Sequence, residues 1–331
     1  MTSINRRDFS LRMAGVAALA AGALPLRALA QSYPAGPVKI IVPYPPGAAT
    51  DTLARVMAQA LQQGVGSNFI VENRGGGGTQ IGTKAIAAAP ADGLTLGFID
   101  TAFVINPGLF GSNLPYDTQK DFTPVSLMAT APLVLIVHSS VPAADMKQFL
   151  ALAKAQAGKL NYGSAGVGSA PHLAGEQLRH AAAIDINHVP YRGGSTVLND
   201  LIAGHIQFGF TTVPTMIEHI RSGAVKALAV TGSTRAAQLP QVPTMAESGL
   251  AAVDASPLFG LIAPSKLPQA LLDRLAAVAG PSVSSGALNA RLKEMGFIPA
   301  GSSPDEFRVR IDSEIKKWSA VIKAGNIKPN A

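Results

Sequence analysis

Residues 38–51 read VKIIVPYPPGAATD. The first five are mostly apolar and rich in β-branched side chains, which predicts a buried strand, and the Pro-Pro-Gly that follows ends it sharply. Apolar residues from Leu53 to Leu61 then recur at helical spacing, so we expect a helix that is capped by Thr50 or Asp51. A strand, a stiff turn and a helix start leave backbone N–H groups open at a helix N-terminus, which suits a small anion such as a carboxylate.

Strand and helix patterns alternate along nearly the whole remaining chain. Strands are predicted at 68–72, 94–99, 133–137, 160–163, 186–189, 206–210, 225–230 and 259–263. Helices are predicted at 80–89, 146–157, 171–180 and 195–203, and the capping boxes Thr244–Glu247 and Ser303–Glu306 mark later helix starts, the second opening a helix that runs past Trp318. This alternation implies an α/β fold of parallel sheets that are covered by helices on both faces.

Loops rich in glycine or proline follow several of these strands, at 45–50, 75–79, 164–169 and 191–195. Ligands of open α/β sheets bind at the carboxyl ends of strands, where such loops meet helix N-termini. The loops divide between the two halves of the chain, which predicts a cleft between two lobes.

Residues 1–30 are typical of an export signal rather than of the fold. Arg6-Arg7 precedes a mild apolar run at 14–26, and Ala28-Leu29-Ala30 offers a small-x-small cleavage site before Gln31, which is the order of an export signal. The paired arginines followed by Phe9 indicate the twin-arginine route. The alternative is a membrane anchor, but the run is too short and too rich in alanine and glycine for a stable span. We therefore expect a soluble, extracytoplasmic mature protein.

Composition excludes several classes of protein. The chain has 331 residues and no cysteine, so it has no disulfide framework, thiolate nucleophile or cysteine-ligated metal. The formal charge of +7 falls to +4 when the signal, with its four arginines and one aspartate, is removed. No basic stripe is interleaved with aromatic residues, so nucleic acid is not an expected partner, whereas a mildly positive surface fits an anionic ligand.

The glycine-rich stretch at 75–84 departs from both nucleotide-binding patterns. Gly77 and Gly82 have the spacing of a phosphate loop, but Thr83-Lys84 reverses the order of lysine and hydroxyl residue that the motif needs. Ile81 stands where a dinucleotide-binding motif has its third glycine. The stretch is either a flexible turn or a loop that opens onto the cleft.

The segment 162–169, YGSAGVGS, partly resembles the nucleophile elbow of serine hydrolases. That motif needs glycine at both second neighbours of the serine, and Tyr162 breaks it for Ser164 while Val167 breaks it for Ser169. A hydrolase that uses either serine is therefore the less favoured alternative. We expect a set of hydroxyl and amide donors for an anion at a helix start, namely Ser164, Gly166, Gly168 and Ser169.

The histidines show no metal-ligand spacing, so no metal site is expected. His172 lies in a candidate loop, where it either contacts the ligand or supports the helix. Arg74 and Arg192 are the cations nearest candidate loops, and each can either bind a carboxylate bidentately or remain in solvent.

Taken together, these motifs resemble the substrate-binding receptors of tripartite tricarboxylate transporters, the Bug proteins. The matching segments are Tyr33-Pro34 with Pro37-Val38, Pro45-Pro46-Gly47 with Thr50-Asp51, Val71-Glu72-Asn73-Arg74 with its glycines, 92–96 (DGLTL), 162–169 (YGSAGVGS), 188–193 (HVPYRG), Asp200-Leu201 and 242–249 (VPTMAESG). They span essentially the whole mature chain in family order.

The resemblance implies a type II periplasmic binding protein with central sheets covered by helices and a ligand cleft between two lobes. The first lobe is expected at 31–131 plus 257–331, and the second at 132–256. Such a receptor closes on a small carboxylate in the periplasm and delivers it to a permease with one large and one small integral membrane subunit. It is expected to be a monomer, with no cofactor and no enzyme activity.

The resemblance also implies a set of ligand-binding residues. In the first lobe these are Pro46, Gly47, Ala48, Thr50, Asp51, Gly78 and Thr101. In the second lobe they are Ser164, Gly166, Gly168, Ser169, His172, Tyr191, Arg192 and Thr211.

Two departures from the family pattern bear on the ligand. Ala48 replaces a usual second glycine, so its methyl group restricts the approach to the loop. Thr211 stands where many members have an aspartate that suits a ligand amino group, which favours a dicarboxylate or an aromatic carboxylate such as terephthalate over an amino acid. A receptor that presents its ligand to a sensor protein remains the alternative to transport.

Overall fold

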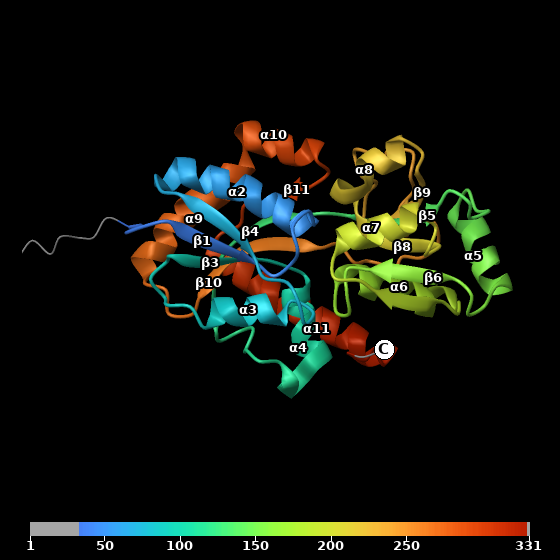
Figure 1. Ribbon diagram of the computed structural model, residues 1–331, viewed down its shortest axis with the longest axis horizontal. Helices are drawn as coiled ribbons and strands as arrows, with labels where there is room; N and C mark the ends of the chain where they lie inside the picture. Colours follow the sequence, from blue (N-terminus) through green and yellow to red (C-terminus); the bar gives the residue numbers. More distant parts are fainter. Residues whose placement is uncertain (1–32, 330–331) are drawn as a thin grey trace, which may run out of the picture. The chain divides into compact units, whose positions relative to one another are not determined.

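The computed structural model describes residues 33–329, so the predicted export signal at 1–30 lies outside the described residues. The chain divides at Ala35/Gly36, and every helix and strand below belongs to the unit that begins at Gly36. Two sheets, each flanked by helices, make up this unit (Figure 1). Within residues 33–329, no helix is long and apolar enough to cross a membrane.

The first sheet has the strand order β11-β4-β10-β3-β1-β2. Its strands are β1 (Val38–Val42), β2 (Phe69–Asn73), β3 (Thr95–Asp100), β4 (Phe122–Thr130), β10 (Leu258–Pro264) and β11 (Ile298–Pro299). β1 pairs in parallel with β2 and β3, with Ile40 opposite Val71 and Leu96, whereas β10 runs antiparallel to β3 and β4. The prediction of purely parallel sheets is therefore wrong, because the late strand β10 returns in the opposite direction between β3 and β4.

Helices cover both faces of the first sheet. They are α2 (Ala49–Val65), α3 (Gln80–Ala87), α4 (Ala102–Phe110), α9 (Gln269–Ser284), α10 (Gly286–Glu294) and α11 (Pro304–Gly325), with a 3-10 turn η1 at Gly111–Asn113. Figure 1 shows α2 and α10 on one side of the sheet and α3 and α4 on the other. α2 packs on α9, and α11 packs on α4.

The second sheet has the strand order β7-β6-β8-β5-β9. Its strands are β5 (Leu133–His138), β6 (Asn161–Ser164), β7 (Asn187–Pro190), β8 (Phe208–Thr212) and β9 (Val225–Val230). Its helices are α5 (Met146–Ala155), α6 (Ala170–Ala182), α7 (Gly194–Ile202) and α8 (Val213–Arg221). β6 is parallel to β7 and β8, but β5 is antiparallel to β8 and β9, so this sheet is mixed as well.

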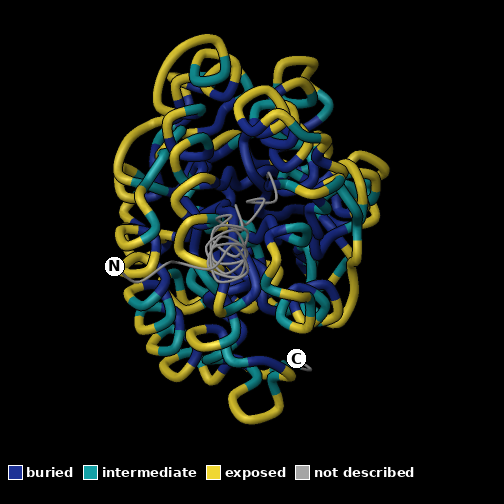
Figure 2. Tube along the Cα trace, turned by 90° about the vertical axis from the view of Figure 1, so that its left-hand side faces the viewer, coloured by how far each residue is buried: buried dark blue, intermediate teal, exposed yellow. Residues whose placement is uncertain are grey.

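The continuous apolar run of β5 follows from burial of both faces of the second sheet. Leu133, Leu135 and Val137 pack in one hydrophobic cluster with residues of α5 and α6. Val134 and Ile136 point to the opposite face and pack in a second cluster with residues of α7 and α8. In Figure 2 such buried stretches lie inside a layer of exposed loops and helix turns.

The chain passes from the first sheet to the second between Thr130 and Leu133, and it returns between Val230 and Leu258. The two connections are joined by a hydrogen bond from the Ala131 N–H to the Pro257 carbonyl, at 3.0 Å. The two sheets thus share no strand, and two hydrogen-bonded backbone segments connect them.

The two capping boxes have different outcomes. Ser303 and Glu306 form the predicted box at the start of α11. The Thr244–Glu247 box also forms, with the Glu247 N–H donating to Thr244 Oγ1 at 3.0 Å, but it opens a turn rather than a helix. The prediction of a helix there is wrong, because Gly249 (φ +80°) follows within the first turn and ends the helical geometry.

Candidate functional site

The loop that follows β1 is fixed by Asp51 and Asn73. Asp51 Oδ2 accepts hydrogen bonds from the Gly47 N–H at 3.0 Å and from Arg55 Nε at 3.1 Å. Asn73 Nδ2 donates to Asp51 Oδ1 at 2.8 Å and to the Tyr44 carbonyl at 3.0 Å. Burial acts to raise the pKa of Asp51, but the hydrogen bonds from Arg55, Gly47 and Asn73 hold that pKa below its usual value. Through these hydrogen bonds Asp51 holds the Pro-Pro-Gly turn in place.

Helix α2 begins without a side-chain cap. Its N-cap residue is Ala48, so the prediction that Thr50 or Asp51 caps the helix is wrong. The turn is complete at Gly47 (φ +84°), and the two predicted caps fall inside the first helical turn. The first hydrogen bond within the helix runs from the Thr52 N–H to the Ala48 carbonyl at 2.9 Å. The N–H groups of the three preceding residues therefore have no acceptor within the helix and point out of its N-terminal end.

The loop between β6 and α6 is closed by Ser169, which is the N-cap of α6. Its Oγ accepts from the His172 N–H at 3.4 Å and donates to the Gly166 carbonyl at 2.7 Å. Gly166 (φ +119°) and Gly168 (φ +80°) adopt left-handed backbone geometry that glycine tolerates best. The loop thus bends tightly toward the start of α6.

Two stacked histidines lie behind this loop. The rings of His172 and His188 are 4.1 Å apart, and His172 Nδ1 accepts a hydrogen bond from the Gly168 N–H at 3.3 Å. Burial lowers the pKa of His172 to about 4, so the ring is neutral at ordinary pH. The sequence left open whether His172 contacts the ligand or supports the helix, and the structure shows instead that His172 supports the loop through the Gly168 N–H.

The ends of β7 and β8 in the second sheet also contribute residues to this site. The Tyr191 hydroxyl, after β7, donates to Asp200 Oδ2 at 2.6 Å. Burial and this carboxylate raise the pKa of Tyr191 to about 12. Thr211 and Thr212 end β8, and Thr212 Oγ1 pairs with Thr215 Oγ1 at 2.8 Å in the first turn of α8.

A small chamber of about 40 Å³ lies where these segments meet. Residues around both sheets line it, including the first residues of α2, α6 and α7 and the N-cap of α8. Of the predicted ligand-binding residues, it is lined by Ala48, Thr50, Ser169 and Thr211. Among the described residues in its wall, Asp100 alone is charged.

An outer hollow of about 780 Å³ adjoins the chamber and shares Tyr44, Ala165 and Ser169 with it. The glycines from Gly75 to Gly78 line this hollow. The sequence left open whether this stretch is a flexible turn or a loop at the cleft, and the structure shows that it opens onto the space between the sheets. Of the predicted residues, the hollow is lined by Pro46, Gly78, Gly166, Ser169, Tyr191 and Arg192.

The remaining predicted residues line neither space and instead support the loops: Gly47, Asp51, Thr101, Ser164, Gly168 and His172. Thr101 Oγ1, for example, accepts the Leu258 N–H at 2.8 Å and so ties the end of β3 to β10. Arg74, the second candidate cation, forms an ion pair with Glu72.

Sequence reasoning missed Tyr44 and Asp100, which line the chamber from the loop after β1 and the end of β3. It also missed Thr212 and Thr215, which line the chamber from the end of β8 and from α8. The available signal for Asp100 was a lone carboxylate directly after the apolar strand at 94–99. In an α/β fold that position lies at the carboxyl end of a strand, where ligands bind.

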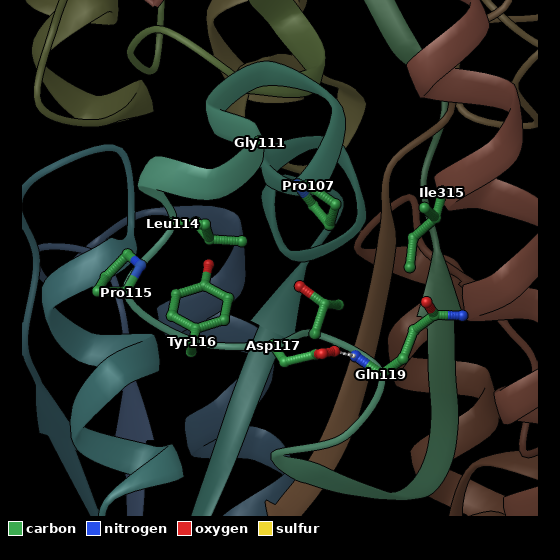
Figure 3. A pocket seen from close by; sticks show the side chains of 9 residues that line it. Pro107, Gly111, Leu114, Pro115, Tyr116, Asp117, Gln119 and Ile315 are labelled. Atoms are coloured by element: carbon green, nitrogen blue, oxygen red, sulfur yellow. Dashed lines mark hydrogen bonds between the residues drawn. The ribbon is translucent and has the colours of Figure 1, made fainter.

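A separate hollow of about 440 Å³ lies beside α4 and contains none of the predicted residues (Figure 3). Tyr116, Asp117 and Gln119 contribute to its wall, and Asp117 Oδ1 accepts the Gln119 N–H at 3.0 Å. A hydrogen bond from Lys120 holds the pKa of Asp117 below its usual value. Its carboxylate is therefore already satisfied by its own loop.

The comparison with known families identifies the chain. The model of the tripartite tricarboxylate transporter family receptor matches residues 53–327. The chain belongs to this receptor family. BugT of Bordetella pertussis is 36% identical to the receptor over 297 residues, which cover 89% of this chain and 90% of BugT. The predicted membership of the Bug family is confirmed.

Solved structures of related proteins superpose closely on this receptor. An R. palustris protein with adipate is 30% identical, with a TM-score of 0.87 over 89% of this chain and 99% of that one. MatC from Rhodopseudomonas palustris with bound malate is 28% identical, with a TM-score of 0.83 over 88% of this chain and 100% of MatC. The predicted α/β fold of a two-lobed type II periplasmic binding protein is confirmed.

Proposed function

We propose that this receptor is a periplasmic solute-binding protein that captures one small carboxylate between its lobes and delivers it to a tripartite tricarboxylate permease. We further propose that residues 1–30 are its export signal, that the first lobe comprises 31–131 and 257–331, and that the second comprises 132–256. The observation that carries the proposal is the chamber whose wall combines helix N-termini and hydroxyl groups from both lobes.

The chemistry of the wall supports an anionic ligand. Open N–H groups at a helix N-terminus, together with the helix dipole, favour negative charge by about 0.3–1 kcal/mol per helix, and by more when the site is partly buried. Thr211, Thr212 and Thr215 add hydroxyl groups, which can donate to a carboxylate without introducing charge. These groups bind and orient an anion without making or breaking a bond.

Contacts between the lobes support capture by closure. A Cβ atom at Gly168 of the second lobe would lie 2.8 Å from Leu109 Cδ2 and 3.1 Å from Asn106 Oδ1, both of α4 in the first lobe. The lobes therefore touch at this point, and the chamber volume of about 40 Å³ holds only a few water molecules. A carboxylate of several carbons needs the lobes to part, and it shifts the open–closed equilibrium by its differential affinity for the closed state.

The relatives support the size class of the ligand. The R. palustris protein is described with adipate and MatC with malate, and both compounds are small dicarboxylates. For this receptor the proposed class is a dicarboxylate or an aromatic carboxylate, since Thr211 supplies a neutral hydroxyl where an aspartate would repel a second carboxylate.

Calorimetric titration tests the proposed function. The purified receptor is titrated with succinate, adipate, malate and terephthalate, and with the uncharged amides of the same skeletons. At least one carboxylate should bind, and its amide should bind at least tenfold more weakly because it lacks the charge that the helix N-termini favour. Equal binding of an acid and its amide, or binding of none of the acids, contradicts the proposal.

A further inference from the structure

Helix α6 carries the glycine-rich loop of the proposed second lobe at its start, since Ser169 is its N-cap. The proposed first lobe touches this helix at both ends. At the start, a Cβ atom at Gly168 would lie 2.8 Å from Leu109 Cδ2 of α4. At the other end, His180 Nε2 lies 3.3 Å from the Gly325 carbonyl oxygen of α11. Because α11 packs on α4 and its end lies beside α6, α4 and α11 form one surface that α6 contacts (Figure 1).

The chain turns back sharply where α11 ends. Asn326 adopts left-handed backbone geometry (φ +49°), and the Ile327 N–H donates to the Ile322 carbonyl at 3.0 Å. This is the Schellman arrangement, in which asparagine or glycine takes the left-handed position and the next residue often packs an apolar side chain back on the protein. Ile327 is accordingly only 8% exposed, whereas its neighbours Asn326 and Lys328 are exposed.

Residues 325–329, which we call the α11 extension, lie against the second lobe. Gly325, Asn326 and Ile327 form one wall of a hollow of about 330 Å³, and residues of α6 and of 185–188 form the rest. Beyond Ile327 the extension reaches the outer hollow, whose wall contains Pro329 together with residues of both proposed lobes. The extension therefore runs from the end of α6 to the edge of the proposed ligand site.

Resting on the proposed function, we infer that the α11 extension contacts the second lobe only in the closed receptor, and that Ile327 is thereby a positioning residue for ligand capture. When the lobes part, α6 leaves the surface of α4 and α11, and the side chain of Ile327 becomes exposed to water. Its burial therefore stabilises the closed form relative to the open one. Ile327 lines neither the chamber nor the outer hollow, so it acts on the ligand through the position of α6.

Calorimetry on Ile327→Ala tests this inference. The receptor is titrated with the tightest binder among succinate, adipate, malate and terephthalate. We expect binding about tenfold weaker than in the native receptor, because the truncation removes apolar contacts of the closed form and so lowers the closed fraction on which the affinity depends. Ile327→Val loses much less apolar volume, and it should bind within about threefold of the native receptor. Partial unfolding lowers the measured stoichiometry rather than the affinity, so it does not produce this result.

Ile311→Ala is the matched control. Ile311 lies on the same helix and is 4% exposed, but it lines a hollow whose described residues all belong to the proposed first lobe. Both alanine variants should lower the urea midpoint of unfolding, since each leaves a cavity. Ile311→Ala should nevertheless bind the carboxylate within about twofold of the native receptor, because a contact that is equal in the open and closed forms does not shift the equilibrium between them.

A distance measurement follows the contact itself. The chain has no cysteine, so nitroxide labels attach only at the introduced Ala181→Cys and Lys328→Cys, which are exposed positions at the end of α6 and on the α11 extension. Pulsed electron paramagnetic resonance should show that the distance between the two labels shortens when the carboxylate is added. This variant keeps Ile327, so it decides the question if Ile327→Ala does not fold.

Two results overturn the inference and leave the proposed function standing. They are equal carboxylate affinities of Ile327→Ala and Ile311→Ala, and a label distance that stays the same when the carboxylate binds. Binding of none of the four carboxylates to the native receptor contradicts the proposed function itself, and this inference falls with it.

Discussion

Ser164 Oγ and His188 Nε2 lie 2.7 Å apart, the separation expected of a serine nucleophile and its base. The environment of the pair argues for a structural role. Ser164 is fully buried, and its Oγ also accepts the Gly166 N–H at 3.2 Å. The hydrogen bonds of the pair therefore fix the loop at 164–169, and they do not expose a nucleophile to a substrate.

We predict that Ser164→Ala lowers the free energy of unfolding by about 1–2 kcal/mol, because the half-buried His188 Nε2 and Gly166 N–H each lose a hydrogen-bond partner. Urea unfolding measures the change. Ser140→Ala is the control, since Ser140 Oγ also lies 2.7 Å from a histidine, His138 Nδ1, but on the exposed surface, where the cost should stay within about 0.5 kcal/mol. Turnover of an ester panel by the native receptor that Ser164→Ala abolished would instead establish the hydrolase alternative.

Gly168 offers a test of closure. Its φ of +80° and its contact with Leu109 mean that Gly168→Ala both strains the backbone and pushes against the first lobe. We predict at least a tenfold loss of ligand affinity, together with a loss of about 1 kcal/mol in unfolding free energy from the strain. Titration calorimetry and urea unfolding separate the two effects.

Gly249→Ala is the matched control for Gly168→Ala. Gly249 has the same φ of +80° but has no atom within 4 Å of the added Cβ. It should show the loss of stability without the loss of affinity. If the two variants bind ligand equally well, contact between the lobes at Gly168 does not contribute to capture.

The local parts of this fold could be predicted from the sequence. The strand, turn and helix at 38–65 and the strand at 133–137, whose residues are all buried, follow from apolar patterns that neighbouring residues create. The direction of β10 could not be predicted, because its partners β3 and β4 are far away in the chain and its apolar run reads alike in either direction. Helices α4, α8, α9 and α10 were also missed. Of these, α4 is apolar on nearly all sides, and α8 follows β8 without an intervening loop.

The loops of the candidate site could be predicted, but the side chains that line its cavities could be predicted only in part. Strand ends and glycine-rich turns identify the loops, since those features are local. Whether a side chain lines the chamber or lies behind it depends on its hydrogen-bond partners, as the engagement of Ser164 with His188 and of Asp51 with Asn73 illustrates. Neither partner is adjacent in the sequence.

Asp51→Asn tests whether Asp51 holds the Pro-Pro-Gly turn in place. We predict a loss of about 1–3 kcal/mol in unfolding free energy at pH 7, because the Arg55 ion pair is lost and the Gly47 N–H has a weaker acceptor. The folded state holds the pKa of Asp51 low, so the native stabilisation is present above the unfolded pKa and falls as the pH drops toward the folded one. Urea unfolding at pH 7 and pH 3 should show that the difference in unfolding free energy between the native receptor and the variant shrinks at the lower pH. A difference that grew at pH 3 would contradict this role of Asp51.

His172 should make stability depend on pH in a defined direction. Burial lowers its pKa to about 4 in the folded state, whereas the unfolded chain titrates near 6.5. Between these values the unfolded state binds more protons, so acidification removes up to roughly 3 kcal/mol of stability. Asp100 acts oppositely, because its folded pKa of about 6 lies above the unfolded value, so the native curve should be comparatively flat from pH 4 to 6.

The contribution of His172 is therefore read as the difference between the native receptor and His172→Gln, in which the contribution of Asp100 cancels. We predict that the advantage of the native receptor in unfolding free energy declines steadily as the pH is lowered from 7.5 to 4.5. His138→Gln, at a histidine paired with exposed Ser140, supplies the baseline for a histidine-to-glutamine change. The ring stays neutral in the folded receptor until the pH nears 4, so its hydrogen bond from the Gly168 N–H persists across this range and the His172 titration should leave ligand affinity unchanged there. An advantage in unfolding free energy that stayed constant from pH 7.5 to 4.5 would show that His172 does not make stability depend on pH.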